Sequence, residues 1–156
     1  MSTKKKYLKF LVLFFCGLSS FSQSILIDGD GTVRCPTASI GASSTISGKT
    51  YYVADDTIIT SILDSGFFTV GSTVVSPTDL SCMCTSQITN MRAMFSGRVT
   101  FNDDISNWDT SRVTTMEDMF RGASVFNQDL SNWDTSNVVN MQQTFFNALD
   151  FNYNIN

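Results

Sequence analysis

The chain has 156 residues, of which ten are basic, fourteen are acidic and none is histidine. The lack of histidine removes the usual general base and both common catalytic triads. Nucleic-acid binding needs Lys and Arg facing phosphates, and the basic residues beyond the N-terminal segment are few and scattered singly. The composition therefore argues against a nucleic-acid partner.

Residues 1–22 are predicted to be a secretory signal peptide. A basic start, which includes Lys4 and Lys9, precedes an apolar run and the small-x-small cleavage site Ser20-Phe21-Ser22. The apolar run is about half the ~20 residues that a transmembrane helix needs, so no transmembrane segment is expected after the signal is removed. Removal takes four of the ten basic residues and leaves six against fourteen acidic ones, a formal net charge of −8.

Export to the medium or the cell surface follows from this signal. An alternative is a lipoprotein signal that acts through Cys16, although Phe14 and Phe15 stand where acylation signals have small residues. The acidic mature chain offers no basic patch for a membrane surface.

Residues 23–76 predict a small β-rich N-terminal cap. Asp28-Gly29-Asp30-Gly31 separates two short apolar stretches and suits a hairpin turn, because Asp and Gly tolerate left-handed backbone angles. Ser47-Gly48-Lys49 separates a second such pair. A terminal unit of this kind would cover the first coil of a repeat array.

A helix is predicted after the second hairpin. Asp55-Asp56 supplies the N-terminal cap, the apolar stripe consists of Ile58, Ile59, Ile62 and Leu63, and Gly66 ends the helix.

The cysteines left after signal removal are Cys35, Cys82 and Cys84. One disulfide is expected in an oxidising compartment, from Cys35 to Cys82 or Cys84, and we favour Cys84. Cys82 and Cys84 are two residues apart, and a bridge between them would strain the backbone. A zinc site is the alternative, but three cysteines without a histidine make a poor tetrahedral set.

Residues 85–156 repeat themselves with an offset of 25 residues. Thr85-Ser86-Gln87-Ile88-Thr89-Asn90-Met91 matches the stretches that begin at Thr110 and Thr135, and Trp108-Asp109-Thr110 matches Trp133-Asp134-Thr135. A fixed period with apolar positions in phase is typical of a solenoid, in which each coil covers the apolar face of its neighbour.

Within each unit, residues such as Val113 and Met116 fall at helical spacing, and the stretch from Phe126 to Trp133 reads as a short extended segment. The expected fold class is α/β: an LRR-like right-handed solenoid of about three coils, with short parallel strands and short helical turns, behind the cap and over residues 77–156. The expected repeat core consists of Met91, Phe95, Phe101, Trp108, Val113, Met116, Met119, Phe120, Phe126, Leu130, Trp133, Val138, Met141, Phe145 and Phe151.

The strings Phe101-Asn-Asp-Asp-Ile-Ser-Asn-Trp-Asp-Thr-Ser and Phe126-Asn-Gln-Asp-Leu-Ser-Asn-Trp-Asp-Thr-Ser-Asn-Val, with Asn140-Met141 after them, resemble the repeat of BspA-like leucine-rich-repeat bacterial surface proteins. The resemblance covers about residues 77–156. It implies a secreted or surface-displayed protein used in adhesion or recognition, with no catalytic residues to carry over. The first unit departs from the pattern, since it has Cys82-Met83-Cys84 where later units have Asn-Trp-Asp.

The sequence therefore predicts a non-catalytic surface protein for recognition or adhesion, without a cofactor and with an unknown protein or surface ligand. A calcium- or glycan-binding module is the alternative, and a secreted hydrolase is a weaker one. The Asp28–Gly31 run lacks the ligands of a calcium loop, because Leu26 and Thr37 stand at its first and last ligand positions. Because no shielding segment follows Ile155 in the sequence, end-to-end self-association is also expected.

Overall fold

The computed structural model describes residues 25–70, 72–77 and 79–153, and the signal peptide expected over residues 1–22 lies outside them. Two hairpins begin the described chain. Strands β1 (Leu26–Ile27) and β2 (Val33–Arg34) pair antiparallel, as do β3 (Ser43–Ile46) and β4 (Lys49–Val53). At the second turn Ser47 and Gly48 have φ of 51° and 83°, the left-handed angles that a tight hairpin requires. Both predicted hairpins are confirmed.

Helix α1 (Asp56–Ser65) follows as predicted. The Asp55 side chain accepts a hydrogen bond from the Ile58 N–H at 2.9 Å, and Gly66 ends the helix with φ of 80°. Ile58 and Ile59 are buried against the core. Their spacing places the apolar stripe of α1 on one face.

The connection from α1 to the repeats contains elements that were not predicted. A third hairpin forms from β5 (Phe68–Val70) and β6 (Thr73–Val75), and the 3-10 turn η1 (Leu80–Cys82) leads into β7 (Met83–Cys84). Strand β7 pairs in parallel with β4 and completes a sheet in the order β3-β4-β7. The N-terminal region, residues 25–84, therefore ends at this strand.

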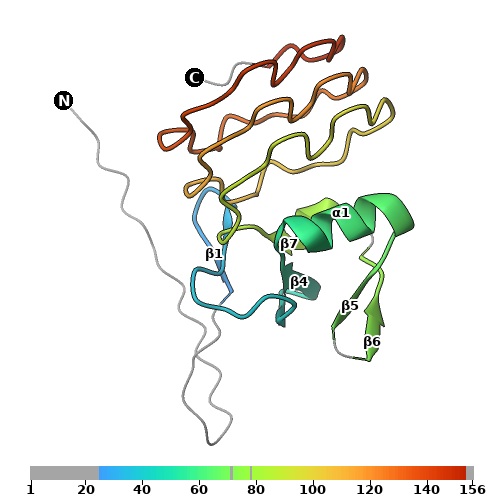
Figure 1. Ribbon diagram of the computed structural model, residues 1–156. Helices are drawn as coiled ribbons and strands as arrows, with labels where there is room; N and C mark the ends of the chain where they lie inside the picture. Colours follow the sequence, from blue (N-terminus) through green and yellow to red (C-terminus); the bar gives the residue numbers. More distant parts are fainter. Residues whose placement is uncertain (1–24, 71, 78, 154–156) are drawn as a thin grey trace, which may run out of the picture.

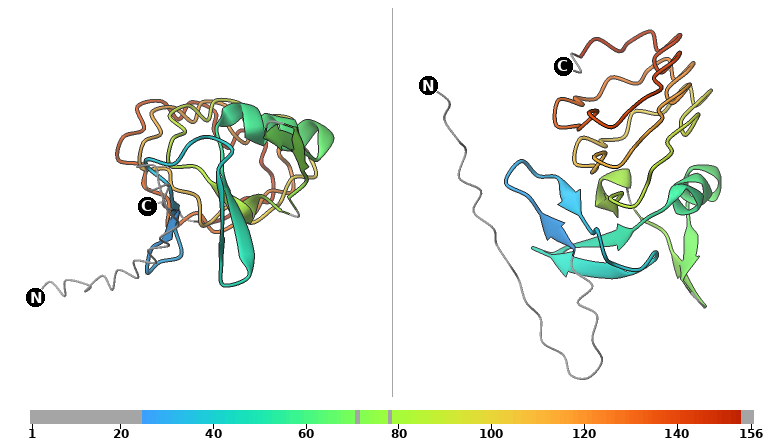
Figure 2. Two further views of the ribbon diagram at one scale, coloured as in Figure 1. Left: turned by 90° about the horizontal axis from the view of Figure 1, so that it is seen from below. Right: turned by 60° about the vertical axis from the view of Figure 1, so that its left-hand side comes forward.

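The three repeats form three layers above the N-terminal region: residues 85–109, 110–134 and 135–153 (Figure 1). Isolated bridges join Asn90 to Thr115 and Thr115 to Asn140, positions 25 residues apart. The first layer meets the N-terminal region where the Val33 N–H donates to the Asn107 carbonyl at 2.9 Å. A second view shows the same order, with the layers on one side of the sheet and α1 beneath them (Figure 2).

The expectation of an α/β, LRR-like right-handed solenoid is wrong. Among the described residues, the single α-helix and the three small, separate sheets all lie before residue 85. The layers contain turns and isolated bridges in place of the short parallel strands and helical turns that were expected.

The backbone conformation of the layers explains why neither element forms. Ala93, Asp118 and Gln143 hold positive φ of 55°, 56° and 56° in the stretch expected to be helical, and a left-handed residue interrupts an α-helix. In the stretch expected to be extended, the Asp129 carboxylate accepts from the Ser131 N–H at 2.9 Å. Such a local turn competes with the hydrogen bonds of a strand ladder.

Phenylalanine columns fill the space inside the layers. Phe95 stacks on Phe120 at 5.3 Å between ring centroids, and Phe120 stacks on Phe145 at 5.4 Å. The rings of Phe101 and Phe126 form a parallel column at 5.6 Å. Large aromatic side chains contribute strongly to burial, so these columns hold the irregular backbone of the layers in register.

Candidate recognition surface

Most of the residues predicted to form the repeat core are inside the layers. Those in the first two layers are buried, apart from Trp133: Met91, Phe95, Phe101, Trp108, Val113, Met116, Met119, Phe120, Phe126 and Leu130. Trp133, Val138, Phe145 and Phe151 are partly buried and pack against the same core. Met141 differs from its equivalents, because 36% of it is exposed whereas Met91 and Met116 are 0% and 1% exposed.

The predicted core lacks four buried residues of the layers: Ile88, Ile105, Ala123 and Ala148. The 25-residue offset contains a signal for them, since Ile88 is equivalent to Val113, Ile105 to Leu130 and Ala123 to Ala148.

Each tryptophan donates a hydrogen bond to the unit below it. The Trp108 indole N–H donates to the Leu80 carbonyl at 3.0 Å, and the Trp133 indole N–H donates to the Ile105 carbonyl at 3.1 Å. The first indole is fully buried. Trp108 therefore joins the first layer to η1 and Trp133 joins the second layer to the first, and the buried ring of Trp108 is not exposed to stack on a sugar.

The asparagines at 102, 127 and 152 lie outside the hydrophobic core and form hydrogen bonds from layer to layer. The Asn127 N–H donates to the Asn102 side-chain oxygen at 2.8 Å, and the Asn152 N–H donates to that of Asn127 at 3.2 Å. These side chains thus satisfy backbone donors of the next layer at the surface.

The junction between the N-terminal region and the layers contains a disulfide and an ion-pair network. Cys35 is bonded to Cys84 across a separation of 49 residues, and Cys82 is free and buried. Arg34 contacts Asp28 at 2.6 Å and the buried Asp109 at 2.9 Å. The disulfide thus joins the end of the first hairpin to β7, and the ion pair between Arg34 and Asp109 joins that hairpin to the first layer.

The Asp109 carboxyl stays ionised in this network. Burial opposes its charge, but hydrogen bonds from Ser111 and Ser86 and the positive charge of Arg34 outweigh burial and lower the pKa of Asp109. At Cys82 burial is not outweighed, and it raises the pKa of the thiol to about 11. A thiol with so high a pKa is a poor nucleophile at neutral pH, so the free cysteine fills space in the core.

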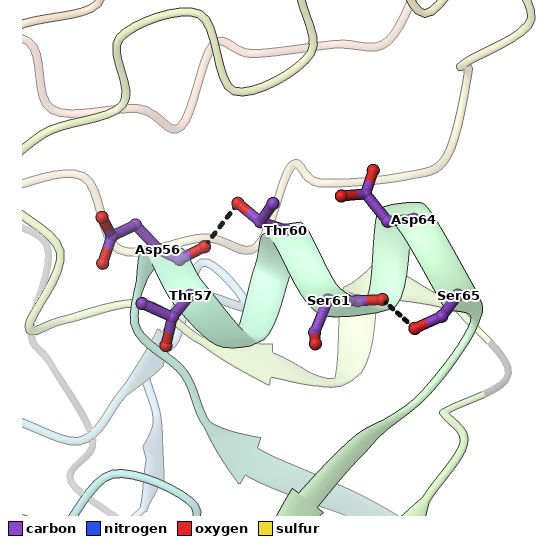
Figure 3. A pocket seen from close by; sticks show the side chains of 6 residues that line it. All are labelled: Asp56, Thr57, Thr60, Ser61, Asp64 and Ser65. Carbon is purple, nitrogen blue, oxygen red and sulfur yellow. Dashed lines mark hydrogen bonds between the residues drawn. The ribbon is translucent and has the colours of Figure 1, made fainter.

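One polar depression lies on α1, with a volume of about 330 Å³ (Figure 3). Three of its four hydroxyl groups already donate to acceptors in or beside the helix: Thr57 to the Asp55 carboxylate at 2.7 Å, and Thr60 to the Asp56 carbonyl and Ser65 to the Ser61 carbonyl, both at 2.8 Å. Asp64 pairs with Arg98. Because one helix supplies the whole lining, the depression lacks the convergent groups of a binding or catalytic site. Its lining residues are Asp56, Thr57, Thr60, Ser61, Asp64 and Ser65.

A search of the described residues finds no group of three or more His, Cys, Asp or Glu side chains placed to hold a metal ion. The same part of the chain contains no helix with the length and apolar character needed to cross a membrane.

The exposed side chains with the most variety lie on the turn face, which we define as residues 89–98, 114–123 and 139–148. At one position of successive layers the residue changes from Arg92 to Glu117 to Gln142. At another it changes from Ser96 to Arg121 to Phe146, and Phe146 is 50% exposed. Neighbouring side chains interact across layers. Arg92 lies 3.3 Å from Glu117, and the Asn140 side-chain N–H donates to Glu117 at 3.0 Å.

In this stack of short repeats the buried positions recur and the exposed positions vary. These features define a class of repeat protein whose regular backbone presents different side chains in each repeat. The model of the family described as "Mycoplasma protein of unknown function, DUF285" matches residues 65–156, more than half of the chain. The chain belongs to this family. No curated protein and no solved structure matches it. The family description carries no function, so the resemblance to BspA-like surface proteins stays a prediction.

Proposed function

We propose that the protein is an exported, non-catalytic module that recognises a protein on a cell or matrix surface through its turn face. One observation carries the proposal: two positions keep Met and Phe in all three layers, from Met91 to Met141 and from Phe95 to Phe145, while the positions between them change. Arg92, Glu117 and Gln142 alternate with Met91, Met116 and Met141 in this way. A rigid frame with varied side chains is how repeat proteins obtain specific binding surfaces.

The chemistry of the turn face favours a polar protein partner with an apolar contact at its centre. Arg121 lies 3.7 Å from Asp118 and 5.7 Å from the ring centroid of Phe146. Exposed aromatic and Arg side chains are enriched where protein interfaces gain most of their affinity. The contact between Arg121 and Phe146 is therefore the place where binding should depend most on single residues.

Binding of residues 23–156 to intact cells and to surface-protein fractions tests the proposal. The matched variants are Phe146→Ser on the turn face and Val74→Ser, which replaces an exposed apolar residue of β6. We expect Phe146→Ser to weaken binding about tenfold or more and Val74→Ser to leave it unchanged. Equal binding by all three proteins would exclude the turn face.

Export is tested separately. We expect the protein to be recovered outside the cytoplasm with its N-terminus just after Ser22. A cytoplasmic protein that keeps residues 1–22 would contradict the export part of the proposal.

A further inference from the structure

Neighbouring layers are joined by rows of backbone hydrogen bonds in which four donors lie on the lower layer and one bond at the start of the row runs the other way, from the Thr114 N–H to the Thr89 carbonyl and from the Val139 N–H to the Thr114 carbonyl, both at 2.8 Å. Every second N–H in the turn segment of a layer donates upward to a carbonyl of the next layer. From the first layer the donors are Met91, Ala93, Phe95 and Gly97, and the acceptors are Thr115, Glu117, Met119 and Arg121, at 2.7–3.0 Å. From the second layer the donors are Met116, Asp118, Phe120 and Gly122, and the acceptors are Asn140, Gln142, Thr144 and Phe146, at 2.8–2.9 Å.

The third layer presents the same row of donors, which we call the donor row: the N–H groups of Met141, Gln143, Phe145 and Asn147. None of these four groups has an acceptor among the described residues. The carbonyls of the same segment point elsewhere, because Met141 accepts from Thr144, Gln143 from Phe146 and Phe145 from Ala148, at 3.0–3.2 Å. The upper edge of the third layer therefore offers a row of four donors, preceded by the Val139 carbonyl, whose equivalents Thr89 and Thr114 each accept from the layer above.

Apolar surface lies beside the donor row. Val139 is 87% exposed and Leu149 is 78% exposed, and Phe145 and Phe151 are only partly buried although their equivalents Phe120 and Phe126 are fully buried. The upper face of the third layer (the red layer in Figure 1) thus continues the interface that joins the layers below it, with Met141, Phe145 and Phe151 in the register of Met116, Phe120 and Phe126.

We propose that this upper face docks the lower face of a further repeat of the same type. The two interfaces between the layers show what fits: a row of four carbonyls, from alternate residues, beside Met and Phe side chains. An ordinary β-strand fits less well, because its edge presents N–H and C=O groups together. Its N–H groups would then face the donor row and remain unpaired, at a cost to binding.

A second copy of this chain is also a poorer occupant. The lower face of its first layer is turned toward its own N-terminal region in both figures, and two third layers placed face to face would oppose donors with donors. The end-to-end self-association expected from the sequence stays a prediction and is one outcome of the test.

The test uses the whole mature chain and a synthetic peptide with the sequence of residues 110–134, a complete repeat. We expect amide hydrogen exchange of Met141, Gln143, Phe145 and Asn147 to slow on adding the peptide, while that of Met116 and Asp118, already bonded, stays slow throughout. A β-strand-forming peptide of the same length and charge should not produce this protection. Absence of protection with the repeat peptide, or equal protection with the strand peptide, would overturn the proposal.

Two variants separate the hydrogen bonds from the apolar contact. Met141→Pro removes one donor and Met141→Leu keeps it, and Met141 is not among the residues with positive φ, so proline suits its backbone better than a left-handed position would. We expect the proline variant to bind the peptide about tenfold more weakly and the leucine variant to bind it normally. Equal affinity of the two would refute the role of the donor row. If the proline variant fails to fold, the exchange measurement on the unchanged chain still decides.

Light scattering over a dilution series tests whether a second copy of this chain occupies the upper face. A mixture of chain and peptide should form a complex of one to one, and the chain alone should remain monomeric. Concentration-dependent oligomers of the chain alone that protect the same four amides would replace the proposed occupant with a second copy.

Discussion

Replacing Trp108 and Trp133 in turn compares the same side chain at two depths of the stack. Each indole N–H donates to a carbonyl of the unit below, at 3.0 and 3.1 Å, so the hydrogen bond is matched. The burial is not: Trp108 is fully buried beside Phe95, at 5.9 Å between ring centroids, whereas Trp133 is partly buried under the outer layer. A difference in stability between the two variants therefore reports burial.

Trp108→Ala should lower the free energy of unfolding by about 3–5 kcal/mol, because it removes a buried aromatic side chain and leaves a cavity. For Trp133→Ala we expect about 2 kcal/mol, which is the transfer term without most of the cavity term, since the outer layer can collapse into the space. Trp108→Phe keeps most of the apolar area and loses the hydrogen bond to the Leu80 carbonyl. The Met83 N–H also donates to that carbonyl, so this loss should cost only about 1 kcal/mol.

Urea unfolding followed by circular dichroism measures all three variants under non-reducing conditions. The order of stability should be wild type, Trp108→Phe, Trp133→Ala and then Trp108→Ala. Equal losses for the two alanine variants would show that the layers do not differ in burial. A Trp108→Ala protein with an unchanged transition would show that this indole lies outside the core.

Four further predictions concern the junction and the turns. Ionised Asp109 has a lowered pKa, so its stabilisation is present above the pKa of the unfolded chain, about 3.9, and is lost as pH falls through the lower folded pKa. Asp109→Asn should therefore lower the melting temperature at pH 7 and reduce its fall between pH 5 and pH 2, and an unchanged acid response would contradict this. Reducing the bond between Cys35 and Cys84, 49 residues apart, should destabilise the protein by about 4 kcal/mol on the loop-entropy model; an equal melting temperature with and without reductant would refute it. Gly122 has φ of 72°, so Gly122→Ala should cost about 1 kcal/mol, whereas Gly29→Ala, with no atom within 4 Å of the added carbon, should be neutral in the same melt. EDTA should not change the melting temperature, and a shift that added calcium reverses would support the calcium-binding alternative.

The N-terminal region shows which elements local sequence predicts well. Asp28–Gly31 and Ser47–Lys49 carry the residues that tight turns require, and Asp55 and Gly66 mark the two ends of α1. Each of these signals acts within a few residues. The hairpin of β5 and β6 was not predicted, because the local signal at Gly66 marks only the end of α1.

The layers show what local periodicity cannot give. The 25-residue offset identifies the buried positions, because it reports which residues face the neighbouring layer. It does not report backbone conformation: Met116, Met119 and Phe120 point inward at helical spacing, yet Asp118 between them has φ of 56°. Hydrogen bonds to the next layer, such as the one from the Asp118 N–H to the Gln142 carbonyl at 2.9 Å, stabilise a turn that no single repeat would form.

The turn face could be inferred only in part. Its exposed positions follow from the offset once the buried ones are known. The donor row, however, depends on which carbonyls accept hydrogen bonds within the turns. That information lies in the backbone angles of all three layers together. The sequence of a single repeat therefore predicts that the end of the stack is exposed, but not whether its free backbone groups are N–H donors or carbonyl acceptors.

Amide hydrogen exchange of the free chain is the most direct test of the account, because it examines the rows of N–H donors that join each layer to the next. The N–H groups of Met116, Asp118, Phe120 and Gly122 should exchange slowly, and the equivalent groups of Met141, Gln143, Phe145 and Asn147 should exchange quickly. Equal protection of the two sets would contradict the account, since it would mean either that the layers are not joined as described or that the upper face of the third layer is already covered.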